Sequence, residues 1–379
     1  MSSNTSDDEV FEYTGNGQSA PTDVVRVVFH PSVTKVDVNL FKNQSYLKEV
    51  ALNEGLVLIG ERAFDGCTSL ERISFPSTVT KMSVDAFLGC NSLKEVALNE
   101  GIVTIGLQAF LRCTSLQSIT IPSSVVEIGR GVFQECSSLR KVVLNEGLKK
   151  IGMISLYGCS SLQSISIPSS VIEIGNAAFA RCSGLREVVL NNGLEKIGGQ
   201  TFDGCHSLES VTLPSALNEI EALAFKSCIK LREVVCSGGL PKISARTFDS
   251  CFALERIIFP NLSSRLEDII QAGQVDVQNK IQQHISRGGI EWRRGGEIFL
   301  PMEEVTRGRD GWDTAKQCLD QINCWIKYYE RKEATTLFEL ALWKAKIDQT
   351  NDTGSHGRDA CRVDVPGPVK DTIKQYLDL

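Results

Sequence analysis

The most regular feature of the chain is an apolar pattern that repeats every 23 residues. An aromatic residue, replaced once by leucine, marks ten successive repeats with no insertion between them: Phe41, Phe64, Phe87, Phe110, Phe133, Leu156, Phe179, Phe202, Phe225 and Phe248. In every repeat a leucine follows six residues later, then a valine or isoleucine after three more, and another apolar residue after a further two. The resulting pattern, L-x-x-[VI]-x-[LIF], predicts one short strand per repeat, with alternate side chains pointing inward.

A period of this length, with one strand in each repeat, is typical of a solenoid. A single repeat cannot bury its own apolar edge, whereas stacked repeats bury a continuous core. We therefore expect an α/β repeat solenoid at residues 24–261: a leucine-rich repeat rod of ten 23-residue units. Neighbouring strands of such a rod pair in a parallel β-ladder, about 4.8 Å apart.

The repeats alternate between two types, which gives a longer period of 46 residues. The strand ends at asparagine in one type and at proline in the other: Asn53, Asn99, Asn145 and Asn191 alternate with Pro76, Pro122, Pro168 and Pro214. The residue after the conserved leucine also alternates in charge, as in Lys48, Glu71 and Lys94. Opposite charges on neighbouring strands predict a solvated face that favours the parallel register.

Residues 105–122, IGLQAFLRCTSLQSITIP, show the whole repeat in one stretch. The pattern I-G-x-x-A-F-x-x-C-x-S-L-x-x-[VI]-x-[LIF]-P closely resembles the BspA-type leucine-rich repeats, and the resemblance covers residues 24–260. It implies the solenoid fold. Known members of that family occur in bacterial surface antigens and in single-celled eukaryotes, and they act as adhesins or binding modules.

The segments outside the repeats have a different character. Residues 1–23 are acidic and polar, and we expect a disordered N-terminal tail without the basic start and apolar core of a secretory signal. Residues 262–379 contain all four tryptophans and several amphipathic stretches, which predict a helical C-terminal cap or small domain. Residues 286–301 predict a loop or short hairpin. The stretches TTLFELALWKAKID and CRVDVPGPVKD resemble the helical tail of uncharacterised repeat proteins of algae such as diatoms.

Nine repeats carry a cysteine three residues after the aromatic position: Cys67, Cys90, Cys113, Cys136, Cys159, Cys182, Cys205, Cys228 and Cys251. Zinc sites use pairs that are much closer in sequence. A strip of stacked thiols remains conceivable as a soft-metal or disulfide site. Packing is the favoured interpretation, because Gln44 fills this slot in the first repeat. Thirteen cysteines without a secretory signal predict reduced thiols, and so a location in the cytoplasm or nucleus.

The search for catalytic chemistry finds no recognisable constellation. Four histidines are scattered, and no nucleophile motif, phosphate loop or dinucleotide fingerprint is present. We therefore predict no enzyme activity, no catalytic residue, no cofactor and no metal. The net charge of −6 argues against nucleic-acid binding. No apolar stretch reaches the roughly 18 residues of a membrane span.

Outward-facing residues on the predicted strands form the candidate partner surface. Toward the C-terminal end of the rod these positions combine apolar and charged side chains, and we predict a protein-binding patch made of Glu187, Val189, Glu233, Val235, Arg256 and Ile258. Strand propensity, or cover by the C-terminal region, would explain the exposed valines equally. The leading hypothesis is a non-catalytic protein-interaction or scaffold module with a protein partner. The alternatives are a cell-surface adhesin and an enzymatic C-terminal region. The oligomeric state does not follow from the sequence.

Overall fold

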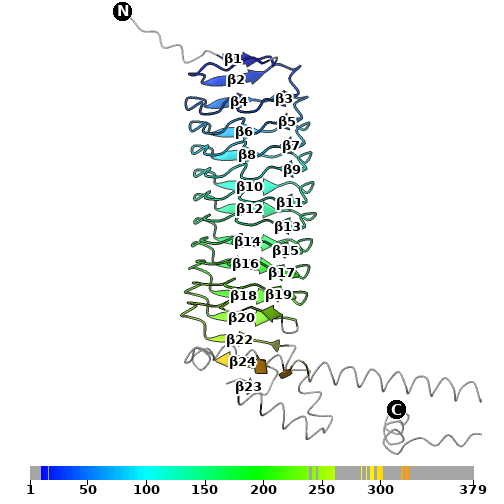
Figure 1. Cartoon of the computed structure of the whole chain (residues 1–379), viewed down its shortest axis with the longest axis vertical. Coiled ribbons are helices and arrows are strands. Elements are labelled where there is room, and N and C mark those ends of the chain that lie inside the picture. Colours follow the sequence, from blue (N-terminus) through cyan, green and yellow to red (C-terminus); the bar gives the residue numbers. More distant parts are fainter. Residues whose placement is uncertain are drawn as a thin grey trace, which may run out of the picture.

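The structure is a computed structural model that describes residues 10–15, 17–238, 241–244, 246–260, 291–293 and 297–301, together with residues 283, 287, 317, 318, 321, 322 and 324. The chain winds into a rod of stacked turns, with one 23-residue repeat in each turn (Figure 1). Each turn has three sides, two of which carry strands. The parallel-strand solenoid expected from the repeat is confirmed.

The first sheet contains the predicted strands. It comprises β2 (Arg26–Phe29), β4 (Glu49–Ala51), β6 (Arg72–Ser74), β8 (Glu95–Ala97), β10 (Ser118–Ile121), β12 (Lys141–Leu144), β14 (Ser164–Ile167), β16 (Glu187–Leu190), β18 (Ser210–Leu213), β20 (Glu233–Cys236) and β22 (Arg256–Ile258). Neighbours pair in parallel with a 23-residue register, as in Ser118 opposite Lys141. Pairing is interrupted between β4 and β6, between β12 and β14, and between β16 and β18.

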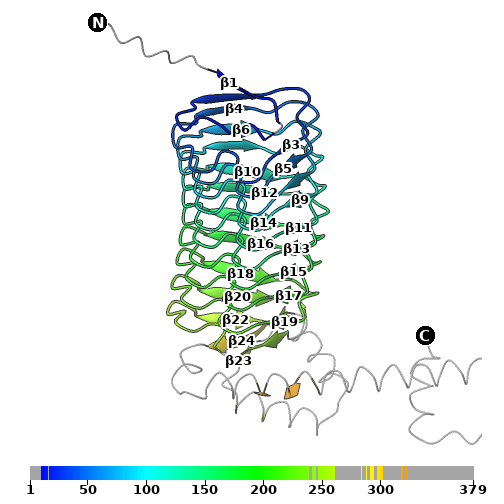
Figure 2. The same cartoon turned by 45° about the horizontal axis from the view of Figure 1, so that its top comes forward.

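The second sheet consists of shorter strands with one exposed and one inward residue. It comprises β3 (Lys35–Val36), β5 (Leu58–Ile59), β7 (Lys81–Met82), β9 (Thr104–Ile105), β11 (Glu127–Ile128), β13 (Lys150–Ile151), β15 (Glu173–Ile174), β17 (Lys196–Ile197), β19 (Glu219–Ile220) and β21 (Lys242–Ile243). Figure 2 shows this sheet running alongside the first along the rod. Its pairing is interrupted once, between β9 and β11.

The third side is built from turns, and this corrects the α/β expectation, because the described residues between 24 and 259 contain no helix. Two positions in every turn have positive φ, and most are not glycine: Asn39, Arg62, Asp85, Gln108, Gly131, Ile154, Ala177, Gln200, Leu223 and Arg246 form one series. The left-handed residues bend the backbone so that it bonds to the next turn, as from Phe64 N to Ala86 O (2.8 Å). Hydrogen bonds between turns thus replace helical ones.

The core is a set of identical positions stacked along the rod. The phenylalanines lie face to face at 5.0–5.6 Å between ring centroids, and Leu156 alone interrupts the stack. The leucines, valines and isoleucines of the predicted strands are buried beside them. This periodic core accounts for the constant repeat length of 23 residues.

The cysteine row is part of this core. Each of the nine thiols donates to the carbonyl of the aromatic position in the preceding turn, 26 residues back, as from Cys113 Sγ to Phe87 O (3.2 Å). Gln44 has no such turn before it, which accounts for the missing cysteine in the first repeat. Packing with a buried hydrogen bond is therefore the role of these side chains.

The N-terminal end corrects part of the predicted disordered tail. Residues 10–13 form β1 (Val10–Tyr13), which pairs in parallel with β2. Tyr13 is fully buried against Phe29 and Phe41, and its hydroxyl donates to Asp37 Oδ2 (2.9 Å). The strand was not predicted because it contains only four residues, and the surrounding segment is acidic and polar.

At the other end the sheet closes with antiparallel strands. β24 (Glu297–Pro301) pairs with β22, and β23 (Glu291–Arg293) pairs with β24, which confirms the hairpin among the two predicted alternatives. Cys318 and Ile322 are buried in the same apolar cluster as the repeats. Most of residues 262–379 lie outside the described residues, so the helical C-terminal region stays a prediction.

Candidate functional site

Exposed apolar side chains are more numerous along the second sheet than along the first. The described residues include twelve exposed large apolar side chains, and seven of them lie on the two rows that flank the second-sheet strands: Val38, Val57, Val103, Leu107, Val126, Met153 and Ile172. The first sheet carries two, Val10 and Val189. Clustered apolar surface indicates an interaction site, whereas scattered residues do not. The second sheet is therefore the better candidate surface.

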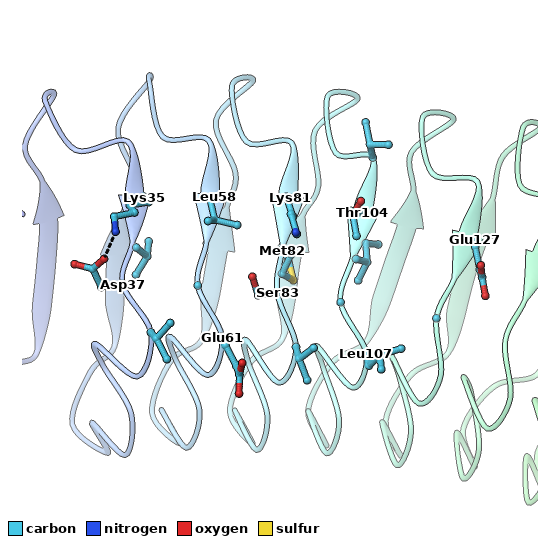
Figure 3. A pocket seen from close by; sticks show the side chains of 18 of the residues that line it. Lys35, Asp37, Leu58, Glu61, Lys81, Met82, Ser83, Thr104, Leu107 and Glu127 are labelled. Carbon is cyan, nitrogen blue, oxygen red and sulfur yellow. Dashed lines mark ion pairs between the residues drawn. The ribbon is translucent and has the colours of Figure 1, made fainter.

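These rows border a shallow groove of about 790 Å³ that crosses β3, β5, β7, β9 and β11 (Figure 3). Its floor runs along the rod through the residue that follows each short strand, usually a glycine such as Gly60, Gly106 or Gly129. A β-carbon at Gly106 would overlap the backbone of Ser83, so glycine permits this close approach of neighbouring turns. The floor consequently presents main chain rather than side chains. We call this feature the second-sheet groove.

A series of hydrogen bonds between successive turns is interrupted inside the groove. Before each second-sheet strand, the amide of one turn donates to the preceding turn: Val103 N to Thr80 O (2.9 Å), then Lys149 N to Val126 O (2.7 Å) and Ile172 N to Lys149 O (3.0 Å). From Val57 to Asn218 every described residue of this series donates such a bond except Val126, whose equivalent acceptor is Val103 O. The groove therefore contains an unpaired main-chain position at Val103 and Val126, whose side chains are 55% and 52% exposed.

A second series of amides is interrupted at the same place. Gly60 N donates to Val36 O (3.0 Å) and Gly152 N donates to Ile128 O (2.8 Å), and the equivalent amides of later turns do the same. Gly106 and Gly129 are the exceptions among the described residues of this series. The N–H groups of Val126 and Gly129 thus make no hydrogen bond across the break between β9 and β11, and that of Gly106 makes none to the preceding β7 turn, among the described residues.

The charges of the second sheet change character at this opening. Beyond it, the exposed strand residues alternate in sign and pair along the rod, as in Lys150–Glu173 (3.2 Å) and Lys242–Glu219 (2.7 Å). Within the groove, Lys81 and Glu127 lie on either side of Thr104, and neither forms an ion pair with any described residue. In the C-terminal half of the second sheet the charged strand residues pair with one another. In the groove, Lys81 and Glu127 are not paired with any described residue and can form ion pairs with a partner.

The patch predicted on the first sheet is assembled only in part. Glu187 and Val189 are exposed, and Val235 is half-buried. Arg256 is paired with Glu233 at 2.6 Å. Ile258 is buried, at 8% exposure, and lies opposite Phe299 of β24, so its inclusion as a surface residue is wrong. The hairpin, which brings a distant segment onto β22, is the reason, and the rest of the patch stays a prediction.

Sequence reasoning missed the groove because it followed only the longer strands. A signal was present in the residues before and after the buried isoleucine of the shorter strands, where Val57, Val103 and Val126 recur. On the first sheet, one ion pair of the predicted alternating row forms, between Lys94 and Glu71 (3.2 Å). The alternation is more complete on the second sheet, where it was not predicted.

The two parallel ladders and the hydrogen-bonded turn side define this protein as a leucine-rich repeat β-solenoid. The chain belongs to the BspA-type leucine-rich repeat family, because the family model for the BspA type leucine rich repeat region (6 copies) matches residues 34–163 and 149–272. The resemblance inferred from residues 24–260 is thereby confirmed.

Solved structures with a similar fold come from bacteria. A leucine-rich repeat protein of Bacteroides ovatus is 24% identical over 62% of this chain and 78% of its own, with a TM-score of 0.38. A leucine rich cell surface protein of Faecalibacterium prausnitzii has the same identity and coverage, with a TM-score of 0.36. The pneumococcal vaccine antigen PcpA is 25% identical over 65% of this chain and 64% of its own, with a TM-score of 0.46. No curated protein matches the chain.

The predicted cytoplasmic or nuclear location is wrong by this comparison, since proteins of this repeat family include a cell surface protein and a vaccine antigen. The prediction failed because it treated unpaired cysteines as a sign of a reducing compartment. Eight of the nine repeat thiols are fully buried and bonded to carbonyls, so they avoid disulfide formation without any help from the surroundings. Among the residues that the structure describes, no helix is long and apolar enough to span a membrane.

Proposed function

We propose that the protein is a non-catalytic binding rod that holds a protein partner in the second-sheet groove. The rod supplies a long rigid scaffold, and the groove supplies apolar contact area together with unpaired main-chain and charged groups. The observation that carries the proposal is the gathering of seven of twelve exposed apolar side chains along this sheet. Burial of such a cluster is the main driving force for protein association.

The proposal is tested by affinity capture with matched baits. Val103→Asp places a charge in the groove, and Val189→Asp places one on the first sheet, also at an exposed valine. We expect proteins captured by the wild type to be retained by Val189→Asp and lost with Val103→Asp. Loss with Val189→Asp alone would transfer the contact surface to the first sheet. Thermal unfolding of both variants shows that each bait is folded.

A second candidate is adhesion at a cell surface. The observation that favours it is the core itself, whose described cysteines form no disulfide and are mostly buried, so that oxidants outside a cell would not reach them. Family relatives named as a cell surface protein and a vaccine antigen are consistent with this role. Labelling of intact cells with a membrane-impermeant reagent, followed by detection of this protein, distinguishes the candidates. The alternative of an enzymatic C-terminal region falls largely outside the described residues.

A further inference from the structure

We infer that the second-sheet groove binds an extended peptide segment in the polyproline II conformation, with an acidic residue at Lys81 and a basic residue at Glu127. This inference rests on the proposed function, because it names the kind of partner that the groove accepts. It is carried by the unpaired amides of the floor, by the spacing of the two charges and by the exposed valines.

The unpaired amides determine what the partner must offer. The N–H groups of Gly106, Val126 and Gly129 have no acceptor among the described residues; those of Val126 and Gly129 belong to the break between β9 and β11, and that of Gly106 belongs to the turn just before it. A partner that buries them has to supply carbonyl oxygens, because an unsatisfied buried N–H is costly. An α-helix cannot do so along its length, since its carbonyls are used by internal hydrogen bonds. A polyproline II segment has no internal hydrogen bonds, so all its carbonyls are free.

The charge spacing distinguishes the two extended conformations. Lys81 and Glu127 lie on β7 and β11, two turns apart along the rod, and the turns stay stacked across the break, as Phe110 on Phe133 shows, so the interval is about 9.6 Å. A β-strand laid along the groove places same-face residues about 6.6 Å or 13 Å apart. A polyproline II segment has three residues per turn and rises about 9.3 Å per turn. It therefore presents two oppositely charged residues, three positions apart, to both groups.

The apolar residues follow the same interval. Val38 and Val84 line one side of the groove two turns apart, and Val103 lines the other side two turns beyond Val57, which lies just outside the lining. Each pair recurs at the length of one polyproline II turn. Proline or valine residues of the partner would contact Val84 and Val103 between the two charged positions, and Val38 and Val57 on the N-terminal side of Lys81. Figure 3 shows Lys81, Thr104 and Glu127 on successive strands along this path.

Binding of synthetic peptides to the full chain tests the inference. The probe is a fluorescein-labelled proline-rich decapeptide with valines and with Glu and Lys three residues apart. One control has Glu and Lys two residues apart, and another is an alanine-rich helical peptide with Glu and Lys seven residues apart, about 10.5 Å along a helix. We expect the three-apart peptide to bind tightest in fluorescence anisotropy. Tighter binding of the helical peptide, or no binding of any peptide, would overturn the inference.

Charge reversal checks the assigned contact at Lys81. Lys81→Glu should weaken binding of the probe about fivefold, as for a partly exposed ion pair. The same peptide with its Glu replaced by Lys should then recover affinity for Lys81→Glu, because two ammonium groups meet two carboxylates. Absence of this recovery would contradict the assignment. Val189→Asp is the matched control and should leave peptide affinity unchanged.

Hydrogen exchange reports on the floor directly. In the free protein the amides of Gly106, Val126 and Gly129 should exchange fast, whereas those of Lys149 and Gly152 are already bonded and exchange slowly. The bound peptide should slow exchange at the first three and leave the other two unchanged. Peptide binding without this protection would refute the main-chain contact. If every peptide fails while capture still depends on Val103, the groove remains the contact surface and only the peptide conformation is wrong.

Discussion

At the scale of single residues, a cysteine thiol completes the hydrogen bonding of each turn. The carbonyl that it reaches also accepts an amide of its own turn, as when Phe64 O accepts from Cys67 N (3.2 Å) and from Cys90 Sγ (3.2 Å). A small apolar side chain with a weak donor fits this buried position better than serine or alanine would. The recurring cysteine thus reflects packing and hydrogen bonding.

Thiol reactivity is one expected consequence. Burial raises the pKa of Cys136 to about 12 and raises that of Cys113 well above its ordinary value, so these groups stay protonated and unreactive at neutral pH. We expect brief alkylation of the native protein to modify exposed Cys324 and to spare the repeat cysteines from Cys67 to Cys228. Peptide mapping by mass spectrometry measures this. Rapid modification of several repeat cysteines would contradict the buried ladder.

Ser155 is a second residue whose environment predicts an effect. It occupies a fully buried slot that alanine fills in several turns, and its hydroxyl has no hydrogen-bond partner among the described residues. Thr201 occupies the same slot and donates to Gly198 O (2.7 Å). We expect Ser155→Ala to raise the free energy of unfolding by about 1 kcal/mol and Thr201→Ala to lower it by a similar amount. Urea denaturation measures both, and equal effects would contradict the assignment.

At the scale of elements, hydrogen bonds between turns replace those within a helix. Val126 and Lys149 occupy the same position in successive turns, but only the amide of Lys149 is bonded. Proline removes an amide, so Lys149→Pro should cost about 1 kcal/mol more stability than Val126→Pro. Urea denaturation of the two variants tests the opening in the groove. A larger loss for Val126→Pro would show that its amide is bonded.

The N-terminal turn provides a pH-dependent element. Lys35 and the Tyr13 hydroxyl both hold Asp37, and these bonds lower the pKa of Asp37 below its ordinary value. A carboxyl group whose pKa is lowered in the folded state stabilises the fold at pH values above its ordinary pKa. This contribution is lost as the pH falls through the pKa of the folded state. We expect wild type to lose more stability than Asp37→Asn between about pH 5 and pH 3. The measurement is urea denaturation of both proteins at each pH. Equal losses of stability in wild type and Asp37→Asn would exclude this contribution.

At the scale of the whole molecule, the unit of construction is two turns. Asn99 Nδ2 donates to Pro76 O and to Val79 O (3.2 Å) in the preceding turn, and the carboxylate of Glu146 accepts from Ser169 and Ser170 in the following one. The hydrogen bond from the Ser169 amide is the main cause that lowers the pKa of Glu146. The turns of Asn53 and Asn99 bond through side chains to the turns on both sides, and those of Asn145 and Asn191 bond to one side, which accounts for the 46-residue period.

This construction predicts how the rod tolerates shortening. Deletion of residues 145–190 removes a complete 46-residue unit and leaves Asn191 in the place of Asn145. Deletion of residues 145–167 removes one 23-residue turn, brings two proline turns together and makes Glu127 and Glu173 neighbours. We expect the larger deletion to retain the higher urea midpoint, because stability in such rods depends on contacts between adjacent repeats. A higher midpoint for the smaller deletion would contradict the two-turn unit.

From the sequence alone, the repeat length, the inward positions of the first-sheet strands and the parallel register could all be derived. These properties follow from the order of apolar residues along the chain, because every turn must present the same side chains to the core. The alternation of Asn53 and Pro76 was visible as well, although its hydrogen bonds were not.

Only the tertiary structure showed where the rod deviates from the regular arrangement of its repeats. β1 caps the first turn, β24 covers β22 and buries Ile258, and the ladder opens between β9 and β11. The residues around Gly106 and Gly129 belong to the same repeat pattern as their neighbours. A hydrogen bond between turns depends on how two turns stack, and this is set by packing across the whole cross-section. For this reason the repeat length predicts the rod. It does not predict the break in hydrogen bonding between β9 and β11, where the candidate binding site lies.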